Sequence, residues 1–128
     1  MKIIAAALVF AVAACAPMQS SATSKVLFGA ERVSEGVMRL TLDNGESHQI
    51  GYNLCSSLLE RRDGTMWTAV PTDEVCTAVL LTLNPGRDAT FEKRLPSDLP
   101  AGEYRYRTSI ESPLGMPMTV ITTAPFTR

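Results

Sequence analysis

The residues of this chain that could take part in chemistry are few. There are three cysteines, Cys15, Cys55 and Cys76, and a single histidine, His48. A thiolate can ligate a metal, but a lone histidine cannot complete a typical zinc site when the cysteines are otherwise committed. The sequence has no nucleophile-elbow motif to support a Ser-His-Asp triad, no phosphate-binding glycine loop and no aspartate-rich calcium loop. We therefore predict that the protein is not an enzyme, has no catalytic or metal-binding residues and needs no cofactor.

The N-terminus has the layout of an export signal. One positive charge, Lys2, precedes an apolar run over residues 3–14, which ends in small residues directly before Cys15. A membrane-spanning helix needs about 20 apolar residues, so this run is too short to span and is typical of a secretory signal peptide. We expect residues 1–14 to be that signal peptide.

The residues around Cys15 suggest a lipid anchor. Residues 12–14, Val-Ala-Ala, precede the cysteine and resemble the bacterial lipobox. The resemblance implies that Cys15 receives a diacylglycerol, that the signal is cut before it and that the new amine is acylated; several acyl chains anchor a protein stably. Ala16, in place of an aspartate, implies the outer membrane, with the domain facing the periplasm. Residues 15–24 are typical of a flexible tether. The alternative is an ordinary signal peptide with an incidental cysteine.

Length and charge exclude several classes of protein. The 128 residues suit one domain, which we place at residues 25–128. The formal net charge is −1, from 12 Lys and Arg against 13 Asp and Glu. A nucleic-acid-binding protein would need a strong basic excess, and electrostatic membrane binding would need a basic cluster. We expect no nucleic-acid partner, and membrane contact through the lipid anchor.

Short alternating segments fill the domain. Strands are expected over residues 25–33, 37–43, 48–54, 58–62, 66–70, 76–83, 89–95, 103–110 and 118–123. The residues expected to face inward include Met38, Leu40, Leu42, Ile50, Tyr52, Leu54, Phe91, Leu95, Tyr104, Tyr106 and Ile110. Asp63-Gly64 predicts a hairpin between two of the strands. Seven to nine short strands with frequent turn signals indicate an all-β sandwich.

Two features make this prediction more specific. Residues 99–104, Leu-Pro-Ala-Gly-Glu-Tyr, resemble the tyrosine corner of Greek-key sandwiches, in which the Tyr104 hydroxyl would bond upstream backbone. Further segments that resemble a family of bacterial immunoglobulin-like domains in small exported proteins are residues 37–42, 51–55, 59–64 leading to Trp67, 83–86 and 99–105. The resemblance covers about residues 37–108 and implies an immunoglobulin-like Greek-key β-sandwich. It implies no settled activity and no catalytic residue.

Cys55 and Cys76 remain as an even pair once Cys15 carries lipid. In an oxidising compartment such a pair usually closes, so we predict a Cys55–Cys76 disulfide. A loop of this length would gain about 3 kcal/mol by the chain-entropy estimate. The alternative is two separate buried thiols.

Arginines provide the charge feature of most interest. Arg105 and Arg107 share the outward face of their strand, and Arg61 and Arg62 belong to the Asp63-Gly64 hairpin. If the hairpin lies beside that strand, these four residues form a possible partner surface for an acidic protein or for lipid head groups. The alternative is a solvated sheet face that prevents aggregation.

Two functions therefore stay open. The first is a lipid-anchored binding or structural module of the cell envelope without catalytic activity. The second is an inhibitor of an envelope protease, because a bacterial proteinase-inhibitor family also resembles this immunoglobulin-like build. An inhibitor needs a rigid exposed loop, for which residues 112–117 are the candidate; a proline-fixed hairpin tip explains that segment equally well.

Overall fold

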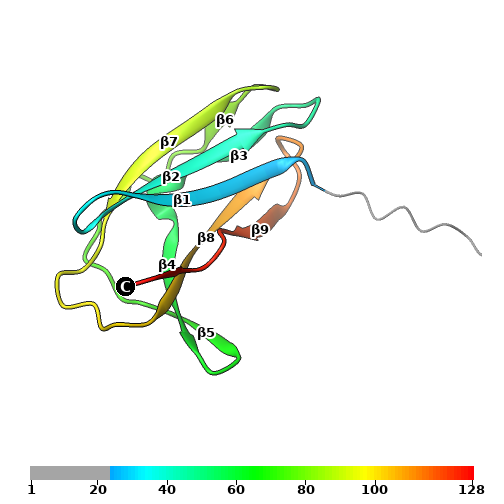
Figure 1. The fold of residues 1–128 in the computed structure, drawn as a ribbon. Coiled ribbons are helices and arrows are strands. Elements are labelled where there is room, and N and C mark those ends of the chain that lie inside the picture. Colours follow the sequence, from blue (N-terminus) through cyan, green and yellow to red (C-terminus); the bar gives the residue numbers. More distant parts are fainter. Residues whose placement is uncertain (1–23) are drawn as a thin grey trace, which may run out of the picture.

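The computed structural model describes residues 24–128 and shows two packed antiparallel sheets (Figure 1). The predictions for residues 1–14 and for Cys15 lie outside this part of the chain. The elements are β1 (Val26–Ser34), β2 (Val37–Asn44), β3 (Ile50–Tyr52), the 3₁₀ helix η1 (Leu54–Ser56), β4 (Leu58–Asp63), β5 (Met66–Ala69), β6 (Leu81–Leu83), β7 (Asp88–Arg94), β8 (Glu103–Glu111), β9 (Met118–Thr122) and β10 (Phe126–Thr127).

The predicted all-β sandwich is confirmed. One sheet has the order β1-β2-β7, and the other has the order β5-β4-β8-β3-β6, with β9 and β10 also paired to β8. Neighbours such as β2 with β7 and β4 with β8 are far apart in sequence, as Greek-key connections require. The described residues contain ten strands, one more than expected, because the short β10 near the C-terminus was not predicted.

The core forms where alternating residues of β2 and β8 face each other. Met38, Leu40 and Leu42 of β2 are buried, and so are Tyr104 and Tyr106 of β8. The Tyr104 hydroxyl donates a hydrogen bond to the Pro100 carbonyl oxygen at 2.6 Å. This bond is the one that the tyrosine corner predicts, and it fixes the chain where it enters β8.

The hairpin at Asp63-Gly64 is also confirmed. It joins β4 to β5, with Asp63 opposite Met66. Gly64 has φ +64°, a left-handed conformation that glycine adopts without steric cost. Arg62 and Trp67 face each other two positions from the ends of the turn. The hairpin therefore places a tryptophan beside the arginines of β4.

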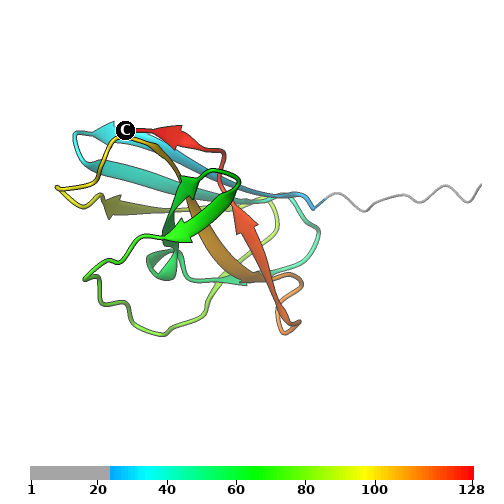
Figure 2. The same cartoon turned by 90° about the horizontal axis from the view of Figure 1, so that it is seen from below.

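The strand expected over residues 76–83 is largely wrong. Only Leu81–Leu83 pairs in β6, whereas residues 70–80 have no regular structure and most of their side chains are exposed. Figure 2 shows this segment as a long loop outside the two sheets. Cys76 is bonded to Cys55, and the Thr77 carbonyl accepts a hydrogen bond from Asn53, so the chain is held away from strand pairing.

Two smaller corrections concern strand ends and orientation. The strand expected over residues 48–54 is limited to β3, because Leu54 begins the 3₁₀ helix that turns the chain toward β4. Phe91 and Leu95 were expected on one inward face, but only Leu95 is buried. Phe91 lies 37% exposed at the edge of the sandwich, beside the 70–80 loop.

Candidate functional site

The pairing of β4 with β8 brings most of the predicted arginine surface together. Glu60 lies opposite Arg105, and Leu58 lies opposite Arg107. On the other side of β4, Trp67 of β5 lies opposite Arg62. Residues that alternate along these strands share the outer face of the larger sheet. We call the resulting group the Trp67–arginine cluster: Glu60, Arg62, Trp67, Glu103, Arg105 and Arg107.

Arg105 is the centre of this cluster. Its Nε donates to Oε1 of Glu60 at 2.9 Å, and its guanidinium carbon lies 4.2 Å from the centroid of the Trp67 ring. Nη1 of Arg107 approaches the second oxygen of Glu60 at 3.7 Å. Glu60 is only 4% exposed because these arginines cover it, and their charges compensate its own. A cation–π contact at a partly exposed site adds about 0.5–1 kcal/mol and fixes the plane of the guanidinium.

Arg62 completes the cluster at the hairpin end. Its Nη1 donates to Oε2 of Glu103 at 3.1 Å, and its Nε donates to the Gly64 carbonyl at 3.0 Å. Its guanidinium lies 6.0 Å from the Trp67 centroid, so two arginines contact the ring. Three arginines face two glutamates in the cluster, which leaves one net positive charge. The surface is therefore an ion-paired aromatic patch with a small positive excess.

Arg61 does not belong to this surface. It alternates with Arg62 along β4, and its side chain lies beside Gly102, with Nε 3.4 Å from the position of a Cβ there. It lines a hollow of about 360 Å³ together with Leu99 and Tyr104. The hairpin does lie beside β8, but only three of the four predicted arginines share one face.

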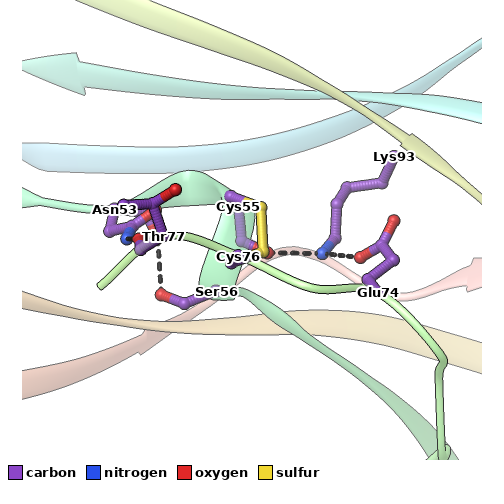
Figure 3. Close-up of a disulfide and its surroundings, with 7 residues drawn as sticks. All are labelled: Asn53, Cys55, Ser56, Glu74, Cys76, Thr77 and Lys93. Atoms are coloured by element: carbon purple, nitrogen blue, oxygen red, sulfur yellow. Dashed lines mark hydrogen bonds and ion pairs between the residues drawn. A yellow bond between two sulfur atoms is a disulfide. The ribbon is translucent and has the colours of Figure 1, made fainter. Parts of the chain in front are cut away.

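Cys55 and Cys76 are joined by a disulfide, as predicted, with a Cα–Cα distance of 5.8 Å (Figure 3). Beside it lies a buried amine that the sequence reasoning missed. Nζ of Lys93 donates to the Cys55 carbonyl at 2.6 Å and to the carboxylate of Glu74, which belongs to the 70–80 loop. The Lys93 side chain is 6% exposed. The disulfide and this ion pair together fasten the loop to the open edge of the sandwich.

Tyr106 is a titratable residue buried in the core. Burial, together with the negative charge of Glu74, raises the pKa of Tyr106 above its ordinary value. The phenol therefore stays neutral in the folded protein, which suits its place in the core.

His48 holds a loop in place. Its Nε2 lies 3.1 Å from Oγ of Ser112, and the neighbouring Gln49 carbonyl accepts from the Leu114 backbone N–H at 2.8 Å. Among the hydrogen bonds of residues 24–128, none joins the second ring nitrogen of His48 to a carboxylate, which is the contact that would orient a catalytic histidine. The same residues contain no group of three His, Cys, Asp or Glu side chains able to hold a metal ion.

No family model, no curated protein and no solved structure matches this chain. Across the part of the chain that the structure describes, no helix is long and apolar enough to cross a membrane.

Proposed function

We propose that this protein is a lipid-anchored, non-enzymatic binding module of the bacterial cell envelope, and that it contacts a partner protein through the Trp67–arginine cluster. The choice of contact surface rests on the stacking of Arg105 on Trp67 on an outer sheet face. The guanidinium carbon lies 4.2 Å from the ring centroid. Tryptophan and arginine are among the residues most enriched at the positions that dominate binding energy in protein interfaces.

The charges of the cluster favour a partner that presents carboxylates. Arg62 and Arg107 have 46% and 43% of their side-chain surface exposed, so both can reach a further acceptor without leaving their glutamates. Arg105 is held in a fixed plane by Glu60 and Trp67. Because the cluster is ordered before binding, little side-chain entropy would be lost on contact.

The anchor limits where that partner can be. Lipidation at Cys15 would leave about ten residues before β1 begins at Val26. An extended chain of this length spans roughly 33 Å at most. The partner would lie in the envelope within that reach of the membrane.

The test is capture of partners from envelope extracts by the membrane-attached protein. Reversal of Arg105 or of Arg107 is a poor variant, because either would place a second carboxylate against the buried Glu60. The double variant Trp67→Ala with Arg107→Gln leaves the Glu60–Arg105 pair in place, and we expect it to reduce recovery of the partner at least tenfold.

Arg39→Gln is the matched control for the change at Arg107. Arg39 lies on the other sheet, is 42% exposed and pairs with Glu31 and Glu92, so its surroundings resemble those of Arg107. Equal capture by the wild type and the double variant would contradict the proposed surface. In the same experiment Cys15→Ser should leave the membrane fraction, and its retention there would contradict the anchor.

The alternative function, inhibition of an envelope protease, rests on the loop at residues 112–117. Hydrogen bonds to Gln49 and His48 hold this loop, as an inhibitor loop would require. However, the Met116 N–H donates to the Pro113 carbonyl at 3.0 Å, which closes the tip into a compact turn. Leu114 also folds back over Gly51. These contacts favour a hairpin tip over a segment that enters a protease cleft.

A further inference from the structure

The chain leaves the domain at one end of the sandwich, and loops are tied together there. The Gly45 N–H donates to the Lys25 carbonyl at 2.9 Å, so the start of β1 is fastened to the β2–β3 loop. That loop in turn accepts a hydrogen bond at Gln49 from Leu114 of the β8–β9 loop. Figure 1 shows the start of β1 and the β8–β9 loop at the same end of the molecule.

This end exposes several large apolar side chains. Leu80 and Leu114 lie together over Gly51, where an added Cβ would come within about 3.0 Å of both side chains. Glu111 lies between Gly51 and Met118 in the sheet, and Met116 and Met118 are 53% and 55% exposed. We call Leu80, Leu114, Met116 and Met118 the apolar end patch. Exposed apolar groups gathered in one place usually mark a contact surface.

The apolar end patch and the Trp67–arginine cluster lie at opposite ends of β8. Glu103 and Arg105 belong to the cluster, whereas Glu111 pairs with Met118 and with Gly51. The nine residues of β8 span roughly 27 Å at the usual rise of a strand. Because alternate residues of β8 share one face, the patch and the cluster lie on the same outer face of the larger sheet and are separated along the strand.

We propose that the apolar end patch lies in the interfacial layer of the bilayer that holds the Cys15 anchor, an inference that rests on the proposed function. The occupant is indicated by where the described chain begins: Lys25 is hydrogen-bonded to the β2–β3 loop, and the same loop is hydrogen-bonded to Leu114 of the patch. A short tether keeps this end near the membrane, and apolar side chains gain roughly 25 cal/mol per Å² on leaving water.

The charged groups near the patch indicate the kind of lipid. Lys25 donates its backbone N–H to Glu46, and the Glu111 carboxylate accepts the Gly115 N–H at the tip of the β8–β9 loop. The carboxylates of Glu46 and Glu111 and the side-chain ammonium of Lys25 together give no positive excess that would attract anionic head groups. The patch therefore suits a zwitterionic surface, entered by apolar contact.

The experiment uses the mature, lipidated protein on vesicles of zwitterionic phosphatidylcholine and phosphatidylethanolamine. An environment-sensitive fluorophore is placed at Met116→Cys or, as control, at Met66→Cys. Met66 is a methionine at the β4–β5 hairpin and is 69% exposed. With Cys55 and Cys76 bonded and Cys15 acylated, the new thiol is the one to be labelled.

We expect a blue shift and strong quenching by brominated acyl chains at position 116, at least fivefold greater than at position 66. Floated protein with equal signals at both positions would overturn the patch proposal and leave the anchor intact. Lipidated protein that does not float would contradict the anchor itself. A shift at position 116 that grows with protein concentration in the absence of vesicles would identify a second copy as the occupant and overturn the proposal.

Discussion

Glu60 and Lys93 are the two buried charged residues of the described domain, at 4% and 5% exposed. Glu60 lies on an outer sheet face and is buried because the side chains of Arg105 and Arg107 cover it. Lys93 lies at the open edge of the sandwich and is buried because a backbone segment, the 70–80 loop, closes over it.

Because Glu60 is covered by side chains, its site can serve as a contact surface. Because Lys93 is covered by a backbone segment, its site holds the fold together. The side chains that cover Glu60 are themselves partly exposed, so a partner can reach them without movement of any backbone segment. The cover over Lys93 moves only if the loop detaches, and the Cys55–Cys76 disulfide prevents that. Removing one member of a buried pair leaves an uncompensated charge, and the cost depends on how easily water reaches it.

The largest effect is expected from loss of the disulfide. The double variant Cys55→Ala with Cys76→Ala should lower the free energy of unfolding by about 3 kcal/mol, because the unfolded chain regains the freedom of a loop of about 20 residues. Urea unfolding at neutral pH measures the change. A loss smaller than about 1 kcal/mol would mean that the loop is held mainly by other contacts and that the disulfide is not what keeps Lys93 covered.

The next effect is expected from Glu74→Gln, which keeps the shape of the side chain and removes its charge from Lys93. We expect a loss of about 2 kcal/mol, below the full cost of an unpaired buried charge because Glu74 is itself one-third exposed. Glu92→Gln is the control, since Glu92 lies on β7 next to Lys93 and pairs with Arg39 in solvent. It should change the stability by less than about 0.5 kcal/mol. Equal losses of stability in the Glu74 and Glu92 variants would show that water reaches Lys93 and compensates its charge.

The smallest effect is expected from Glu60→Gln. The arginines released by this change are partly exposed and can be hydrated, so the loss of stability should be about 1 kcal/mol or less. The salt dependence of partner capture should rise, because Arg105 and Arg107 gain free charge. Both are measured on one preparation, by urea unfolding and by capture at two salt concentrations. A loss above about 2 kcal/mol would place Glu60 among the structural charges with Lys93.

Alternation along the chain was enough to predict β2 and β8, because both strands have one face in the core and one toward solvent. It failed in the 70–80 loop, where the apolar residues Val79 and Leu80 are exposed. An apolar run can be a buried strand or an exposed patch, and only the pairing of distant segments decides between them.

The candidate site shows the same limit. Arg105 and Arg107 could be placed on one outward face from the alternation of β8, but the burial of Glu60 depends on the register between β4 and β8. Lys93 carried a usable signal, since it stands two positions before Leu95, which follows β7 directly and is buried. The general rule that lysine stays exposed masked that signal.

β8 has a consequence for the order of folding. Its partners β3 and β4 precede it in the chain by about forty residues or more, while β9 and β10 follow it, so the larger sheet has no centre until Glu103–Glu111 is available. Pairings between distant segments form slowly, because the intervening chain must first be ordered. A polypeptide with its central strand so late remains open during synthesis, which is the state in which an exported chain, as proposed above, would have to pass through a membrane.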